Sequence, residues 1–437
     1  MHRLKHWLHR RQRPVRYALL DGLLATQALT REQVLRKQAA DRRAMVRYAR
    51  DHTPYYREAF ARLPDDVAFD ALPILHKEIV RQRLTDLLAD EADRDSVKVG
   101  HTGGSTGKPL AFYYDEAKHE LMRAGMCRSY MMSGWRPGEK ILNFWGARQD
   151  TQAGGVFGAG WGDLIAAEKT IPAHEYTTDR LREWAGVVGA YRPVLLQGYT
   201  SILAALASFV IENRIAMPNS LRGVYSTAEV LDDRQRQLME QAFGCKVFNQ
   251  YGSREVPNIA CECRHGNMHV FTDMVQLESQ RCGNEDRLLV TSLTNRLMPF
   301  IRYDIGDSGR LKAGDCPCGS PFPLMEMGMC RKNDLIRTRS GKAIHPSYFN
   351  GLLYGLTRIE QYQFVQTGID RIVLNVVSAS ALEPGIIAAL RRQIRDDVDT
   401  AMEIDVAYLP EIERTTSGKH RFVICQVPES DTWKEQA

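Results

Sequence analysis

The 437-residue sequence has no long hydrophobic run, no strong excess of one charge and no repeated or low-complexity segment. No stretch approaches the roughly 20 consecutive apolar residues that a membrane-spanning helix needs. Lysine and arginine exceed aspartate and glutamate by 58 to 53, and the net charge of +5 is too small for a general nucleic-acid binder. Hydrophobic residues (44%) and charged residues (25%) are near the globular average, which excludes wholesale disorder. The sequence therefore predicts a folded cytoplasmic protein that binds no nucleic acid and is large enough for two domains.

A disulfide framework is not expected either. The nine cysteines are an odd number in a long chain without a convincing secretory signal. The apolar run from Ala18 to Leu29 is interrupted by Asp21, and no clean cleavage site follows it. The start is basic, which leaves two interpretations: a solvated amphipathic helix, or a helix that contacts an anionic membrane surface. The basic residues are Arg3, Lys5, Arg10, Arg11, Arg13 and Arg16.

Helices and strands alternate in the pattern of residues 115–260. Such alternation favours parallel strands, with a site at their carboxyl ends. Short apolar runs predict strands over residues 140–145, 194–198, 223–226 and 246–249. Helical spacing predicts helices over residues 178–190, 200–213 and 232–243.

The flanking regions have other patterns. Apolar residues three and four apart predict a helix over residues 18–50. A strand, a polar loop and a second strand are expected between residues 97 and 114. Further strands are expected over residues 268–278, 287–294 and 300–303.

A domain boundary is expected near residues 328–334, and a helix near residues 384–400 follows it. We therefore predict an α/β protein. Residues 1–330 would form a large domain of layered sheets with helices, including a β-rich segment over residues 260–325. Residues 331–437 would form a small, mobile α+β lid.

The polar loop is rich in glycine. Glycine permits positive φ, so that backbone N–H groups can face an anion, while hydroxyls and a lysine add donors and charge. The loop lacks the glycine and the Ser/Thr of a P-loop at the positions of Thr102 and Pro109. An ordinary turn is the alternative to a phosphate site. The residues are Thr102, Gly103, Gly104, Ser105, Thr106, Gly107, Lys108 and Pro109.

Further motifs follow this loop in a fixed order. With it, they resemble the adenylate-forming superfamily of acyl-CoA synthetases and adenylation domains, in particular the phenylacetate-CoA ligase branch and its CapK-like relatives. The resemblance covers most of the chain, and the order of the motifs makes it specific. The motifs are Ser226-Thr227-Ala228-Glu229, Asn249-Gln250-Tyr251-Gly252-Ser253-Arg254-Glu255, Arg302-Tyr303-Asp304-Ile305-Gly306-Asp307 and Arg414-Thr415-Thr416-Ser417-Gly418-Lys419.

The resemblance implies an enzyme that activates a carboxylic acid with ATP and Mg²⁺. An acyl-adenylate and pyrophosphate form first, and the acyl group then passes to a thiol such as that of coenzyme A. Phosphate charge must be neutralised in the first step, so that cations and N–H donors are needed. Lys419, on the mobile lid, would reach the carboxylate and the α-phosphate, and Glu255 would ligate Mg²⁺.

Other residues would bind the nucleotide. The loop at 102–108 would hold phosphates, Asp307 would bind the ribose hydroxyls, and Tyr251 would offer its face to adenine. Taken alone, Tyr251 could be a core residue, Asp307 and Glu255 surface charges, and Lys419 part of an exposed loop. The remaining nucleotide-site residues implied by the motifs are Ala228, Glu229, Asn249, Gly252, Ser253 and, at the hinge, Arg331.

The sequence departs from the family near the hinge. Cys330 precedes Arg331 where glycine is usual, residues 340–346 lack an expected asparagine, and Asn350 replaces a common glutamate. These changes leave adenylation untouched but put coenzyme A in doubt as the acceptor. A carrier-protein thiol or an amine, in surface-polysaccharide or secondary-metabolite biosynthesis, is the alternative.

Two short segments of cysteine and histidine, about 50 residues apart, have the composition of a structural zinc site with four N/S ligands. Cys316 and Cys318 form one pair. On the other segment the family-like spacing favours Cys263 with His269, while Cys261 and His265 are rival ligands. The alternative is a set of buried thiols without metal.

Aromatic residues near strand ends favour an apolar or aromatic acid as substrate, although each could equally belong to the core. A dimer is compatible with the sequence, which does not determine the oligomeric state. The aromatic residues are Trp145, Tyr199, Tyr225 and Phe248.

Overall fold

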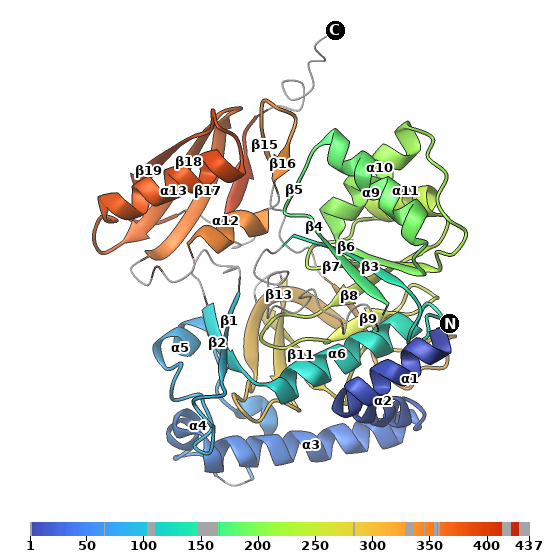
Figure 1. Ribbon diagram of the computed structural model, residues 1–437. Coiled ribbons are helices and arrows are strands. Elements are labelled where there is room, and N and C mark those ends of the chain that lie inside the picture. Colours follow the sequence, from blue (N-terminus) through green and yellow to red (C-terminus); the bar gives the residue numbers. More distant parts are fainter. Residues whose placement is uncertain are drawn as a thin grey trace.

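The computed structural model describes residues 2–64, 66–102, 110–146, 165, 167–282, 285–327, 335–344, 346–353, 356, 359–412 and 421–427 (Figure 1). The helices are α1 (His2–Gln12), α2 (Pro14–Gln27), α3 (Arg31–His52), α4 (Pro54–Ala59), the 3₁₀ turn η1 (Phe69–Ala71), α5 (Lys77–Gln82), α6 (Glu116–Met131), α9 (Thr178–Tyr191), α10 (Thr200–Glu212), α11 (Asp233–Phe243), α12 (Pro346–Leu352) and α13 (Pro384–Asp397). Among these helices, none combines the length and the apolar character needed to cross a bilayer.

One sheet of eleven strands forms the centre, in the order β11-β12-β13-β14-β10-β9-β8-β7-β6-β3-β4. The first seven of these in chain order are β3 (Ile141–Trp145), β4 (Glu168–Pro172), β6 (Leu195–Tyr199), β7 (Gly223–Thr227), β8 (Lys246–Tyr251), β9 (Ala260–Glu262) and β10 (Met268–Val270). The remaining four are β11 (Val275–Cys282), β12 (Glu285–Ser292), β13 (Tyr303–Lys312) and β14 (Leu324–Met327).

The strands β4, β3, β6, β7 and β8 are parallel, as expected. Their alternate residues supply two cores. Leu142 and Phe144 pack with α9–α11 on one face, while Ile141 belongs to the core that includes α6 on the other (Figure 1). The predicted helices 178–190, 200–213 and 232–243 correspond to α9, α10 and α11.

Three expected elements are wrong in extent. The helix 18–50 is two helices, because Thr30 caps α3 in a capping box with Gln33. The strand 268–278 is divided into β10 and β11 by a turn at residues 271–274. In that turn Asp273 forms a buried ion pair with Arg128 of α6. The strand expected at 300–303 is β13, which begins only at Tyr303 and contains the motif residues from Tyr303 to Asp307.

A separate sheet of order β19-β18-β17-β20 forms the C-terminal region, with α13 against it (Figure 1). This arrangement confirms the predicted α/β class, with a large sheet, helices and a distinct C-terminal sheet. The boundary near 328–334 lies outside the described residues, so the division of the chain there stays a prediction. The strands are β17 (Ile359–Gly368), β18 (Arg371–Ser378), β19 (Glu403–Tyr408) and β20 (Val423–Cys425).

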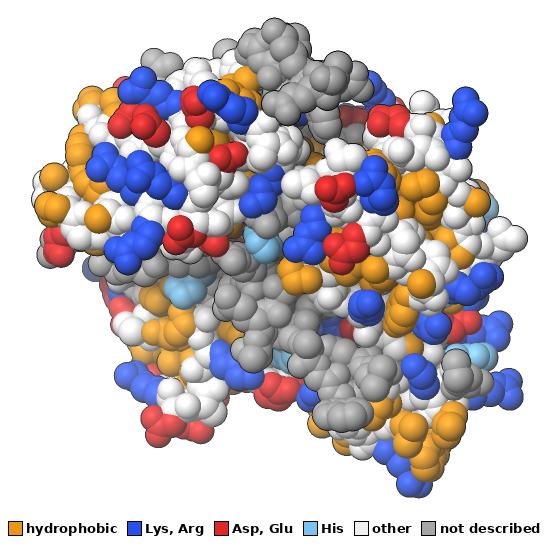
Figure 2. Space-filling model, turned by 45° about the horizontal axis from the view of Figure 1, so that its top comes forward, with side chains coloured by type: hydrophobic (Ala, Val, Ile, Leu, Met, Phe, Trp, Pro, Cys, Tyr) orange, Lys and Arg blue, Asp and Glu red, His pale blue; other side chains and the backbone are white. Residues whose placement is uncertain are grey.

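Two smaller sheets complete the structure. The hairpin β1 (Lys98–Thr102) and β2 (Leu110–Tyr114) flanks the glycine-rich loop, as predicted. A three-stranded sheet joins β15 (Ile336–Arg337) and β16 (Ala343–Ile344) to β5 (Glu175–Tyr176). On the face shown in Figure 2, the basic and acidic side chains of the described residues are interspersed, in keeping with the small net charge.

Candidate functional site

The carboxyl ends of β7 and β8 bring two of the predicted motifs side by side. These strands are parallel neighbours, with Ser226 opposite Asn249 and Thr227 opposite Gln250. The Thr227 hydroxyl donates to the backbone oxygen of Gln250 over 3.0 Å. Motifs separated by about two dozen residues of chain therefore meet at one edge of the sheet, as the parallel arrangement predicts.

Tyr251 links this edge to the antiparallel half of the sheet. Its hydroxyl donates to Oδ2 of Asp307, on β13, over 3.2 Å. The two residues expected to contact adenine and ribose are thus adjacent, although they come from separate motifs. Neither is a fully buried core residue nor a fully exposed one.

A tight turn after β8 positions Glu255. A Cβ at Gly252 would lie 2.8 Å from the backbone nitrogen of Asn258, so only glycine fits there without a shift. The Ser253 hydroxyl accepts from the backbone N–H of Val256 over 3.0 Å. The turn brings Glu255 inside, where it is 4% exposed and accepts a 2.8 Å hydrogen bond from the Tyr303 hydroxyl.

Arg254 connects the same turn to the glycine-rich hairpin. Its guanidinium donates to the backbone oxygen of His101 over 3.0 Å. Thr102 follows directly, at the end of β1. The described candidates Thr102, Tyr251, Glu255 and Asp307 therefore lie around one region. The candidates Gly103, Gly104, Ser105, Thr106, Gly107, Lys108, Arg331 and Lys419 lie outside the described residues.

The carboxylate of Glu229 is directed to a helix terminus. It accepts from the backbone N–H of Ser201 over 2.7 Å and from the Ser201 hydroxyl over 3.2 Å, which caps the first turn of α10. The preceding Ala228 has φ +66°, a left-handed conformation that is uncommon outside glycine. The backbone of Asn249, in β8, donates to Glu262 over 2.8 Å.

Lys118 is a charged neighbour of this region that the sequence did not indicate. It lies in the first turn of α6, where a lysine reads as an ordinary surface residue. Although the residue is partly exposed, its Nζ is buried without a hydrogen-bond partner among the described atoms and lies 4.4 Å from the ring centroid of Phe112. Burial lowers the pKa of Lys118 from 10.5 to about 7, against the opposing effect of the Glu255 charge.

We expect Lys118→Met to stabilise the protein, most strongly below pH 7. The pKa is 10.5 ordinarily and about 7 in the fold, so the unfolded chain binds the additional proton between these values. The wild-type protein therefore becomes more stable as the pH increases from 7 to 10.5. Below pH 7 the full cost of burying the charged lysine is present. At about 1.4 kcal/mol per pKa unit the penalty is at most about 5 kcal/mol, and solvent relaxation makes about 2 kcal/mol a realistic gain.

Urea unfolding at pH 6.5 and pH 9.5 measures this gain. The matched control is Lys98→Met, which removes a half-exposed lysine that pairs with Glu116 at 3.2 Å. An equal gain at both pH values, or a gain in the control, would contradict the assignment of a buried, poorly charged Lys118.

Of the four aromatic residues considered for the acyl pocket, three are buried in the cores, Tyr199 among them, and Trp145 is partly buried. Tyr225 and Phe248 are buried and stacked, with ring centroids 5.0 Å apart and planes at 12°, beneath α6. Trp145 and Tyr199, at the ends of β3 and β6, form an edge-on pair with centroids 5.0 Å apart. Only this second pair lies at the strand ends.

The structure brings together the four favoured members of the cysteine and histidine segments. The ligand atoms of Cys263, His269, Cys316 and Cys318 all lie within 4.8 Å of one another. Cys263 Sγ and Cys316 Sγ are 3.6 Å apart, close to the roughly 3.8 Å that two thiolates span on a tetrahedral zinc ion. Cys261 is not in the group, and burial raises the pKa of its thiol, which disfavours a thiolate ligand.

Two backbone turns present these thiols. Gly266 and Gly319, both at φ +76°, close turns in which their N–H groups bond to the backbone oxygens of Cys263 and Cys316. The amides of His265 and Ser320 point at Sγ of Cys263 and Cys318 over 3.4 Å each. N–H groups directed at sulfur suit thiolate ligands.

His269 completes the group. Its Nδ1 lies 3.0 Å from the backbone oxygen of Phe322, an acceptor that requires a proton on Nδ1. Nε2 is then an acceptor, 3.2 Å from Cys318 Sγ. Four convergent N/S donors, three of them buried, are the donor set that a structural zinc ion takes.

Comparisons with known proteins agree with this fold. Residues 336–426 match the family model described as the CapK C-terminal domain. Protein CapK of Staphylococcus aureus is 26% identical over 363 residues, 81% of this chain and 79% of that protein. A phenylacetate-coenzyme A ligase of Thermus thermophilus is 23% identical over 446 residues, 91% of this chain and 98% of that enzyme.

Among solved structures, a 2-hydroxyisobutyryl-CoA ligase in complex with its acyl-AMP and CoA superposes with a TM-score of 0.60. It is 19% identical and the match covers 91% of both chains, so it shows a shared fold. The chain is therefore similar to CapK and to phenylacetate-CoA ligases, which confirms the resemblance predicted from its motifs.

Proposed function

We propose that the protein is an AMP-forming acid:thiol ligase. It would activate a carboxylic acid with ATP, release pyrophosphate and pass the acyl group to a thiol such as that of coenzyme A. The observation that carries the proposal is the contact between Tyr251 and Asp307 beside the buried Glu255. These are the nucleotide and Mg²⁺ positions that the motifs imply; Tyr251 and Asp307 come from β8 and β13, and Glu255 from the turn after β8.

In this reaction Asp307 accepts hydrogen bonds from the ribose hydroxyls, and Tyr251 lies against adenine. The Tyr251–Asp307 hydrogen bond holds both side chains in place before the nucleotide binds. Glu229 caps α10, so the adenine border at residues 228 and 229 is supplied by backbone rather than by the Glu229 carboxylate.

Glu255 fits the binding of Mg²⁺. Hard cations take carboxylate oxygens together with phosphate oxygens, and one oxygen of this buried carboxylate is oriented by Tyr303. A bound Mg²⁺ would neutralise phosphate charge. The loop at 102–108 supplies N–H and hydroxyl donors with Lys108, and Lys419 supplies a cation to the substrate carboxylate and the α-phosphate.

A small C-terminal domain over residues 331–437 would act as the lid that carries Lys419. The separate sheet and core of this region support a body that can move as a unit. The hinge would lie at Arg331. A rotation of the C-terminal domain about this hinge would withdraw Lys419 from the site after adenylation. The same rotation would open the site to the acceptor.

The acid would be aromatic or otherwise apolar. Trp145, partly buried at the end of β3 against the buried Tyr199, supplies an apolar side chain, and relatives are named for phenylacetate. The second candidate function keeps adenylation and changes the acceptor to an amine or a carrier protein. The departures at Cys330, at residues 340–346 and at Asn350 favour this alternative.

The cysteine and histidine group would hold a structural zinc ion. Cys263, His269, Cys316 and Cys318 supply four ligands, which leaves no open position for catalysis. The ion would join the β9–β10 turn to the segment after β13, and so brace the strand that carries Asp307.

Acid-dependent ATP–pyrophosphate exchange tests the proposal. A panel of aromatic, aliphatic and hydroxylated acids should contain at least one that supports exchange above a reaction without acid. Consumption of coenzyme A with that acid would then separate a thiol ligase from the amine or carrier-protein alternative. If no acid in a broad panel supports exchange, the proposed first half-reaction is wrong.

A further inference from the structure

Helix α1 exposes its apolar side to solvent. Leu4, Trp7 and Leu8 are spaced as i, i+3 and i+4, which places them on one helix face, and they are 60%, 49% and 39% exposed. Val15, in the first turn of α2, is 57% exposed. Ten large hydrophobic side chains are exposed in the described part of the chain, and four of them fall within these twelve positions. We refer to Leu4, Trp7 and Leu8 as the exposed stripe.

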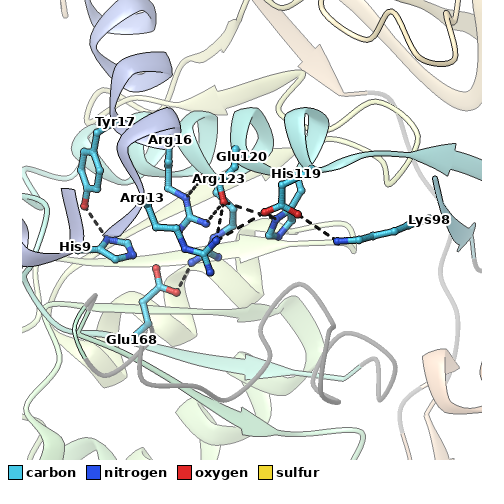
Figure 3. A network of polar contacts seen from close by, with 10 residues as sticks. His9, Arg13, Arg16, Tyr17, Lys98, His119, Glu120, Arg123 and Glu168 are labelled. Carbon is cyan, nitrogen blue, oxygen red and sulfur yellow. Dashed lines mark hydrogen bonds and ion pairs between the residues drawn. The ribbon is translucent and has the colours of Figure 1, made fainter. Parts of the chain in front are cut away.

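The opposite side of α1 is polar and faces the protein. His9 is 6% exposed, and its Nδ1 lies 2.9 Å from the Tyr17 hydroxyl (Figure 3). Burial lowers the pKa of His9 to about 4, so the ring is neutral near pH 7. At the start of the helix, a Cβ on Gly138 would lie 2.3 Å from the backbone oxygen of His2, which shows how closely α1 packs there.

A buried ion-pair network joins α2 to α6. Arg16 donates two hydrogen bonds, of 2.9 and 2.8 Å, to the Glu120 carboxylate of α6 (Figure 3). Arg123 of α6 pairs in turn with Glu168 of β4. Helix α2 also buries Leu20 and Leu23 in the core, so it is α1 alone that directs its polar side inward, although an amphipathic helix ordinarily buries its apolar side. The exposed stripe therefore belongs to none of the hydrophobic cores of the described residues.

The charges around the exposed stripe are basic. No acidic residue precedes Asp21, and Arg3, Lys5 and Arg11 accompany the stripe. Arg10 pairs with Asp21, and Arg13 pairs with Glu116 and Glu120 of α6. The Arg11 guanidinium lies 4.0 Å from the centroid of the Trp7 ring. Tryptophan and arginine on an apolar face are suited to the boundary between lipid head groups and acyl chains, where one end of each side chain is apolar and the other polar.

We propose that α1 docks the protein on an anionic lipid surface. Leu4, Trp7 and Leu8 enter the boundary between head groups and acyl chains, and the flanking arginines contact lipid phosphates. A bilayer with anionic lipids matches both the apolar stripe and its basic surroundings. A second copy would bring two basic surfaces together around the stripe, which charge repulsion disfavours.

Co-sedimentation of the full chain with vesicles tests this proposal. We expect binding to phosphatidylcholine vesicles that contain phosphatidylglycerol, at least about tenfold weaker binding to phosphatidylcholine alone, and weakening as salt rises. The double variant Trp7→Ala/Leu8→Ser should lose at least about tenfold in affinity for the anionic vesicles. The charge variant Arg3→Glu/Arg11→Glu should lose binding as well, by removing the electrostatic attraction.

The matched control is Leu35→Ser/Leu311→Ser, which removes two apolar side chains of similar exposure, 40% and 43%, from other parts of the surface. It should bind like the wild type, and all variants should keep the wild-type unfolding temperature. Equal binding to both vesicle types, or an equal loss in the control, would overturn the proposal. It would also be overturned if Trp7→Ala/Leu8→Ser converted a dimer into a monomer, because the stripe would then be a subunit interface.

Discussion

Replacing Glu255 by glutamine should lower acid-dependent ATP–pyrophosphate exchange by about a hundredfold or more. The carboxylate is 4% exposed and oriented by Tyr303, and the isosteric amide cannot supply the negative charge that attracts Mg²⁺. The concentration of Mg²⁺ that gives half-maximal exchange should rise in this variant. Titration of Mg²⁺ in the exchange assay measures both effects.

Two comparisons separate metal binding from a merely structural role. Tyr303→Phe keeps the charge of Glu255 and removes only the 2.8 Å hydrogen bond that orients it, so its loss should be much smaller. Lys419→Ala should also abolish exchange, but without a recovery at high Mg²⁺. If Glu255→Gln exchanges at the wild-type rate with the wild-type Mg²⁺ requirement, the assignment of Glu255 is wrong.

Replacing Cys316 by serine should release a stoichiometric zinc ion and lower the free energy of unfolding by about 4 kcal/mol. Cys316 Sγ lies 3.6 Å from Cys263 Sγ and accepts from Asn267 Nδ2 over 3.3 Å, so the change removes one of four convergent ligands. Elemental analysis of the purified protein and urea unfolding measure the two effects. A strong chelator should produce the same destabilisation in the wild type.

Cys261→Ser is the matched control for this prediction. Cys261 is fully buried two positions from Cys263, yet it is not in the ligand group. The control should retain zinc, and any destabilisation should not depend on the chelator. A wild-type protein that is purified without zinc and is indifferent to chelators would leave the four residues as a buried thiol cluster and contradict the prediction.

Local signals were sufficient for much of the fold. Helices α9, α10 and α11 and the parallel strands between them agree with the periodicity of their residues, because each element buries one regular face. The break between α2 and α3 also has a local signal, since Thr30 followed by Gln33 is a capping box. The sequence therefore contains the information that separates these two helices.

Other features depend on contacts between distant segments. The turn between β10 and β11 is associated with Asp273, whose partner Arg128 is 145 residues away. Glu229 lies in a nucleotide-site motif, but its carboxylate caps a helix through Ser201, 28 residues earlier in the chain. Lys118 reads as a solvated lysine, and only the packing around Phe112 and Glu255 removes its Nζ from water. No sequence window contains this information.

The sequence by itself determined the order of the motifs, the chemical types of their residues and the alternation of helices and strands. These are local properties, set by side-chain chemistry and by the periods of helix and strand. Only the tertiary structure decided that Tyr251 meets Asp307, that Cys263 rather than Cys261 joins the cysteine and histidine group, and which side of α1 faces outward. The apolar and basic residues of α1 are plain in the sequence, but burial of its polar side against α2 and the backbone at Gly138 is a property of the folded chain.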